Sequence, residues 1–83
     1  MSKALFENLG TGERVLKLLK STKEYGGPQS LKDVCKNLQM SNNNARSVLS
    51  KMYKSGKIDR IELAVYRVKG DERDYDPDKP HYG

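Results

Sequence analysis

Residues 30–60 read SLKDVCKNLQMSNNNARSVLSKMYKSGKIDR and contain two apolar patterns of helical period with a short break between them. Each pattern places apolar side chains at i, i+3, i+4 and i+7, the spacing typical of the buried stripe of a helix. The first pattern comprises Leu31, Val34, Cys35 and Leu38, and the second comprises Ala45, Val48, Leu49 and Met52. Gly56 follows the second pattern, at a place where a glycine in the left-handed conformation commonly ends a helix.

Both helices have a candidate N-cap. Ser30 stands three residues before Asp33, an acidic near-match to a capping box, and Ser41 precedes the second helix. About three residues separate the two helices, which is the spacing of a helix-turn-helix.

The flanking sequence adds one helix before this pair and a hairpin after it. Thr11 can cap a helix over about 12–23, which has Val15, Leu16 and Leu19 on one face. The segment 25–28 (YGGP) ends this helix, and a short extended link through Gln29 follows. From Ile58 to Val68 the apolar residues are interleaved with charged ones, which predicts a β-hairpin that turns near Leu63-Ala64. We therefore expect a mainly α fold of three helices with a small β-hairpin.

With 83 residues, the chain has room for a single core. We expect an N-terminal arm at residues 1–10, which includes the apolar Leu5, Phe6 and Leu9, and a folded domain at residues 11–69. Residues 70–83 show no regular spacing of apolar residues and contain Pro77 and Pro80, so we expect them to form an acidic, disordered tail.

The order helix, extended link, helix, turn, helix and hairpin resembles the winged helix-turn-helix superfamily, and in particular its small bacterial, archaeal and viral regulators. The resemblance covers residues 11–69, and its most specific part runs from Ser41 through Leu49 and Met52 to Gly56 and Arg60. It implies that the third helix enters the major groove of DNA and that the hairpin, or wing, lies along the backbone or the minor groove.

Charge supports a polyanionic partner. Residues 1–70 carry 14 Lys and Arg against 6 Asp and Glu, whereas residues 71–83 carry 2 against 5. A basic body of this kind attracts nucleic acid or an anionic membrane surface. Because no Asp or Glu occurs from residue 41 through residue 58, nucleic acid is the first interpretation.

At about 100° per residue, the apolar stripe of the third helix turns its polar residues outward. Asn and Arg can bond adenine and guanine edges, while Ser and Lys can bind base edges or phosphates. The expected major-groove contacts are Asn43, Arg46, Ser47, Ser50 and Lys51, and Asn42 lies in the first turn, where its backbone amide could take a phosphate. The expected phosphate contacts are Lys54, Lys57, Arg60, Arg67 and Lys69.

Other classes of function find little support in the residues. His81 is the one histidine and Cys35 the one cysteine, so we expect no catalytic residues, no metal site, no cofactor and no enzyme activity. The longest uncharged apolar stretch, Leu63 to Tyr66, is far below the roughly 20 residues of a membrane span, and a cytoplasmic location with no membrane partner is expected.

The sequence thus predicts a regulator of transcription or replication that binds double-stranded DNA. The alternative is a winged-helix module for protein interaction, using the apolar wing tip (Leu63, Val65) and the N-terminal arm. RNA binding is a less favoured option because the chain has few aromatic residues to stack unpaired bases. Homodimerisation stays open, and the tail could bind a protein partner, screen the basic face or simply solvate the domain.

Overall fold

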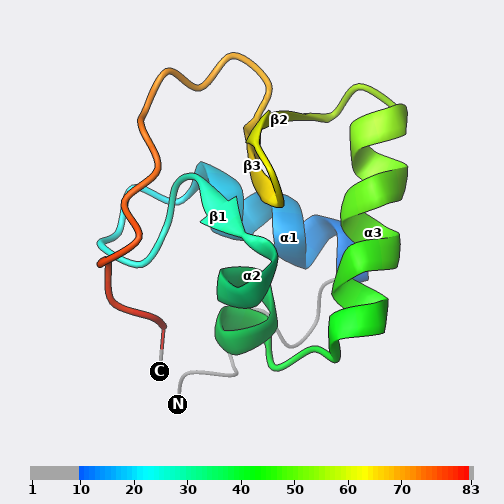
Figure 1. Ribbon diagram of the computed structural model, residues 1–83, viewed down its shortest axis with the longest axis horizontal. Helices are drawn as coiled ribbons and strands as arrows, with labels where there is room; N and C mark the ends of the chain where they lie inside the picture. The colour runs from blue at the N-terminus through cyan, green and yellow to red at the C-terminus, as the bar shows by residue number, and fades with distance from the viewer. Residues whose placement is uncertain (1–9, 83) are drawn as a thin grey trace.

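The computed structural model describes residues 10–82, so the predicted arm lies outside the described residues except for Gly10. The elements are α1 (Thr11–Lys20), β1 (Gln29–Ser30), α2 (Leu31–Leu38), α3 (Asn42–Lys54), β2 (Ile58–Glu62) and β3 (Val65–Val68). Three helices followed by a hairpin, with a short strand before α2, make a winged-helix-like arrangement (Figure 1). The predicted fold class is confirmed.

Helices α2 and α3 begin where the caps predicted them. The Ser30 hydroxyl accepts the Asp33 N–H at 3.1 Å and the Asp33 carboxylate accepts the Ser30 N–H at 3.0 Å, which completes a capping box. Ser41 accepts the Asn44 N–H at 3.2 Å. After α3, Gly56 has φ +81°, the left-handed conformation expected of a helix stop.

The prediction for α1 was less accurate. Gly10, not Thr11, is the N-cap residue, and its cap has no side-chain hydrogen bond. The helix ends at Lys20 instead of residue 23, because the backbone of Ser21 leaves the helical conformation. The Ser21 hydroxyl then accepts the Lys23 N–H in the segment that follows.

The sheet is antiparallel with strand order β1-β3-β2, so the link through Gln29 is a short edge strand paired with β3. In the hairpin, Arg60 pairs with Tyr66 and Glu62 pairs with Val65, which leaves Ile61 as an extra residue in a bulge. The turn falls at Leu63-Ala64 as predicted. Ala64 has φ +57°, a left-handed conformation that costs a non-glycine residue about 1 kcal/mol.

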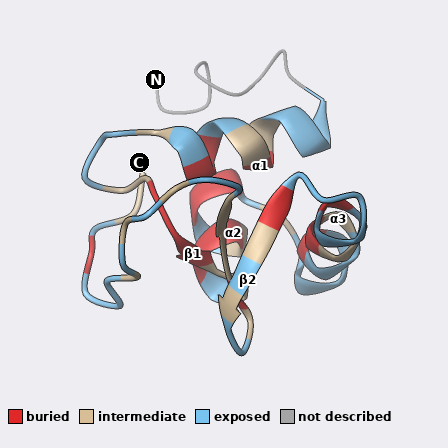
Figure 2. Cartoon of the chain, turned by 90° about the horizontal axis from the view of Figure 1, so that it is seen from above, coloured by how far each residue is buried: buried red, intermediate tan, exposed pale blue. Residues whose placement is uncertain are grey.

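The core lies where the helices meet one face of the sheet. The buried residues belong to α1, α2, α3 and the start of β2, while the outer side of α3 is exposed (Figure 2). The core residues are Val15, Leu18, Leu19, Val34, Leu38, Ala45, Leu49, Met52 and Ile58. Tyr66 and Val68 pack against them, so alternation along β3 turns Val65 and Arg67 to the opposite face of the sheet.

Residues 71–82 lie against the domain without regular secondary structure, in contrast to the disordered tail that the composition predicts. Arg73 donates to the carbonyls of Leu19 and Ser21 at the end of α1, and Tyr75 donates to Asp33. Lys79 donates to the carbonyls of Gly26 and Pro28 and is buried. Arg73, Lys79 and Tyr75 thus donate hydrogen bonds to acceptors on the domain. The composition of the tail does not reveal these contacts.

Candidate nucleic-acid interface

The exposed side of α3 is polar and cationic. Its last turns bring Lys51 and Lys54 to the surface, and its first turn contains no acidic residue. The outward residues are Asn42, Asn43, Arg46, Ser47, Lys51 and Lys54, all exposed, with Ser50 half-buried. The helix therefore presents donors along its whole length and no carboxylate to repel a polyanion.

The turn of the helix divides this surface into two flanks. Arg46, Ser50 and Tyr53 follow at i, i+4 and i+7, so they form one row along α3. The ring of Tyr53 contacts Tyr66 of the wing, with centroids 6.5 Å apart, which places this row on the wing side. Asn44, Ser47 and Val48 instead line a hollow that Thr11 and Arg14 also line, so they lie on the flank nearer α1.

On the wing side, Arg60 lies over Tyr53. The Arg60 guanidinium carbon is 5.2 Å from the centroid of the tyrosine ring, within the range of a cation–π contact. The predicted contact residue Arg60 is therefore brought beside α3.

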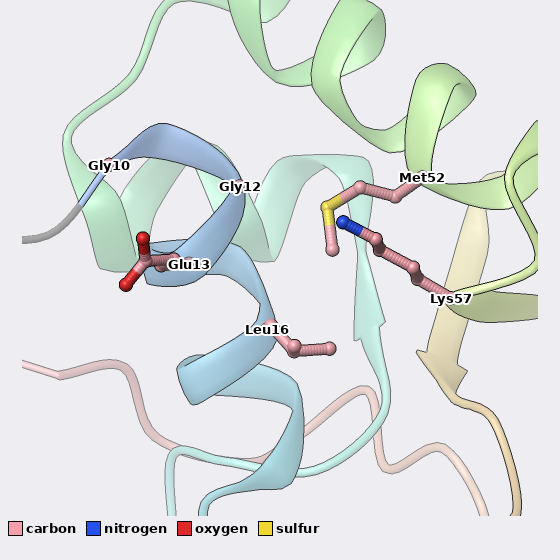
Figure 3. Close-up of a pocket in the computed structure, with 6 residues that line it drawn as sticks. All are labelled: Gly10, Gly12, Glu13, Leu16, Met52 and Lys57. Carbon is pink, nitrogen blue, oxygen red and sulfur yellow. The ribbon is translucent and has the colours of Figure 1, made fainter.

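Two shallow hollows lie on the α1 side. One, of about 270 Å³, is lined by residues from α1, α3 and the start of the wing: Gly10, Gly12, Glu13, Leu16, Met52 and Lys57. The Lys57 side chain lies beside the Met52 side chain and points towards α1, so it is on the α1 side of α3 (Figure 3). The other hollow, of about 400 Å³, is mainly polar and contains Arg14, which donates to the Leu38 carbonyl at 2.5 Å.

The structure separates Arg67 from this surface. Its side chain is on the sheet face opposite Tyr66 and donates to the Arg73 carbonyl at 3.0 Å. Lys69 is exposed at the base of the hairpin, where its N–H donates to the Lys57 carbonyl at 3.4 Å. Of the wing cations, Arg60 and Lys57 thus lie beside α3, Lys69 is exposed at the base of the hairpin, and Arg67 is used to hold the tail.

The tail and α3 lie at opposite ends of the molecule, with the remaining elements between them (Figure 1). The acids of the tail are largely turned outward: Glu72, Asp74, Asp76 and Asp78 are exposed. The tail therefore does not cover the polar face of α3, which was one of its expected roles.

Asp33 holds the tail from the domain side. Its carboxylate accepts the Tyr75 hydroxyl at 3.0 Å and lies 2.8 Å from Nε2 of His81. Burial acts to raise the pKa of Asp33, but the hydrogen bonds from the Ser30 N–H, His81, Tyr75 and the Ser30 hydroxyl outweigh it and hold this pKa below 3.8. Burial also lowers the pKa of Lys79 and raises that of Tyr75.

Within residues 10–82 no group of three or more His, Cys, Asp or Glu residues could hold a metal ion. No helix in this part of the chain is long and apolar enough to cross a membrane. Comparisons of the chain with protein-family models, curated proteins and solved structures give no significant match.

Sequence reasoning missed Tyr53, Tyr66 and Arg14 as residues beside the polar face. A signal for Tyr53 was present, because it stands seven residues after Arg46 and so belongs to the same row of α3. Arg14 and Tyr66 gave no such signal, since their proximity to α3 depends on how α1 and the wing pack.

Proposed function

We propose that this protein binds double-stranded DNA, with α3 in the major groove, and acts through this binding as a regulator of transcription or replication. The observation that carries the proposal is the exposed face of α3, which presents asparagine, arginine, serine and lysine without a carboxylate. These are the side chains that bond base edges and phosphates.

The two flanks of α3 support the same function. A helix in the major groove has a sugar-phosphate strand on either side of it, so cations are needed on both flanks. Arg60 supplies one on the wing side, and Lys57 supplies one on the α1 side. In this proposal Asn43, Arg46, Ser47, Ser50 and Lys51 face bases, and Asn42, Lys54, Lys57, Arg60 and Lys69 face phosphates.

Fluorescence anisotropy with a labelled duplex pool of random sequence tests the proposal. Affinity should fall by orders of magnitude between about 50 and about 200 mM salt, because several phosphates are neutralised. The double variant Arg46→Glu and Lys51→Glu should lose binding and remain folded, since both side chains are exposed.

The matched control is Lys20→Glu with Lys23→Glu, which changes the net charge equally on exposed residues at the tail end of the molecule. The control should retain most of the affinity. Absence of binding by the unmodified protein at the lower salt, or equal losses in the two double variants, would overturn the proposal.

A second candidate function, binding to a protein partner through the wing tip, is favoured by Leu63, which is 90% exposed; Val65, the other residue predicted for this surface, is buried and does not contribute. Under this alternative, Leu63→Asp would abolish function while the α3 double variant left it intact. Under the DNA-binding proposal the order of the two effects is reversed.

A further inference from the structure

The seam between α3 and the wing contains a cluster of three side chains that we call the seam cluster: Tyr53, Arg60 and Tyr66. Arg60 and Tyr66 are cross-strand partners, so they lie on the same face of the hairpin. Tyr53 reaches them from the last turn of α3, and its ring makes an edge-type contact with that of Tyr66 at an interplanar angle of 66°. Tyr53 remains 43% exposed, so the cluster is open to solvent.

The contact with Tyr53 leaves the hydrogen-bonding capacity of Arg60 unused. A cation–π contact engages the ring face, whereas a phosphate would be bound by the N–H groups at the rim of the guanidinium. Within residues 10–82, Asp71 lies 2.8 Å from Arg73 and Asp33 lies 2.8 Å from His81, and no carboxylate forms an ion pair with Arg60.

The bulge in the hairpin turns Glu62 away from the face that carries Arg60. Because Ile61 is the extra residue, Glu62 pairs with Val65, whose side chain is on the face opposite Tyr66. Glu62 accordingly adds to the negative potential at Tyr75 in the tail. Asp59 pairs with Arg67 on that same far face. The seam cluster thus lies on the face of the hairpin from which both wing acids are turned away.

We propose that Tyr53 is a positioning residue for DNA binding: it holds the Arg60 guanidinium at the seam so that Arg60 binds a phosphodiester of the strand that passes between α3 and the wing. This inference rests on the proposed function, because it names a residue pair that contacts a DNA phosphate on the same DNA-binding surface. Packing against Tyr53 restricts an otherwise flexible side chain before the phosphate arrives, which lowers the entropic cost of forming the contact.

A double-mutant cycle on the full chain tests the proposal, with affinity measured on the random duplex pool across a salt series. Arg60→Gln should weaken binding and lower the slope of log affinity against log salt by about one. Tyr53→Leu should weaken binding about two- to fivefold with Arg60 present, the range of an exposed cation–π contact, and should change little once Arg60 is Gln. Tyr53→Phe retains the ring and should keep the affinity.

Each outcome of the cycle is decisive. Equal effects of Tyr53→Leu in the two backgrounds would show that the ring acts without Arg60 and would overturn the proposal, as would an unchanged salt slope in Arg60→Gln. If Tyr53→Leu lowers the unfolding temperature so that it cannot be used, Tyr53→Met replaces it in the same cycle. Failure of the unmodified protein to bind any duplex would instead overturn the proposed function itself.

Discussion

At the scale of single residues, Asp33 links the start of a helix to the end of the chain. One oxygen, Oδ2, accepts the Ser30 N–H and the Tyr75 hydroxyl, both at 3.0 Å, while Oδ1 lies 2.8 Å from His81. The residue is buried, so these partners replace water around a carboxylate whose charged form burial disfavours. One side chain therefore stabilises both the N-terminus of α2 and the docked tail.

This arrangement predicts that stability falls in acid. The pKa of Asp33 in the folded protein lies below its unfolded value of 3.8, so its stabilisation is complete above that pH and is lost as the pH falls through the folded pKa. Asp33→Asn should lower the free energy of unfolding by about 1–3 kcal/mol near neutral pH, because hydrogen bonds to a charged group are lost. It should also reduce the dependence of stability on pH in the acid range.

Thermal unfolding followed by circular dichroism, repeated between about pH 2 and about pH 7, measures both effects. Asp74→Asn is the control, since Asp74 is an exposed acid of the tail. An Asp33→Asn variant with the melting temperature and acid sensitivity of the control would contradict the prediction.

At the scale of elements, the sequence predicted best what depends on local contacts. The α2 cap was predictable because Ser30 and Asp33 bond each other's backbone amides across three residues. The hairpin turn at Leu63-Ala64 was predictable from periodicity, although Ala64 offers none of the residues that ease a positive φ. For the candidate interface, the exposed polar face of α3 was predictable from the helical period. The separation of Arg67 from that face was not, because it depends on which face of β3 packs against the core and on a tail carbonyl that accepts its hydrogen bond.

The docked tail was not predictable because its contacts span long sequence separations. Arg73 donates to the Leu19 carbonyl at 3.0 Å and to the Ser21 carbonyl at 2.7 Å, and its guanidinium is oriented by an ion pair with Asp71 at 2.8 Å. The same ion pair holds the pKa of Asp71 below its usual value. An arginine in this place satisfies carbonyls that the end of α1 leaves without helical partners.

Arg73→Gln should therefore weaken the junction between α1 and the tail. We expect a loss of about 1–3 kcal/mol in the free energy of unfolding, since charge-assisted hydrogen bonds to otherwise unpaired carbonyls are removed. Chemical denaturation measures the loss, and hydrogen exchange of the backbone amides in residues 71–82 should become faster. Glu72→Gln, at the exposed neighbouring position, should change neither quantity. Unchanged exchange in the Arg73 variant would contradict the assignment of Arg73 as the anchor of the tail.

At the scale of the whole molecule, charge is separated along its length. The cationic face of α3 occupies one end of the longest axis, which measures 31 Å, and the tail occupies the other (Figure 1). At a salt concentration of about 0.1 M the Debye length is about 10 Å, so most of the field of the tail acids is screened before it reaches α3. The net charge of +5 therefore understates the potential that a DNA strand meets at α3.

This separation predicts how the tail acids affect DNA binding. Neutralising the four exposed acids together (Glu72→Gln, Asp74→Asn, Asp76→Asn and Asp78→Asn) leaves the anchors Arg73, Tyr75, Lys79 and His81 in place. At about 0.15 M salt the affinity for duplex DNA should change by less than about twofold, whereas at about 0.01 M, where the Debye length is about 30 Å, it should rise clearly. Anisotropy at the two salt concentrations measures both values, and an unchanged melting temperature would show that the tail is still docked. A rise of tenfold or more at the higher concentration would mean that the tail leaves its site and screens α3 directly, which would contradict the fixed separation of charge seen here.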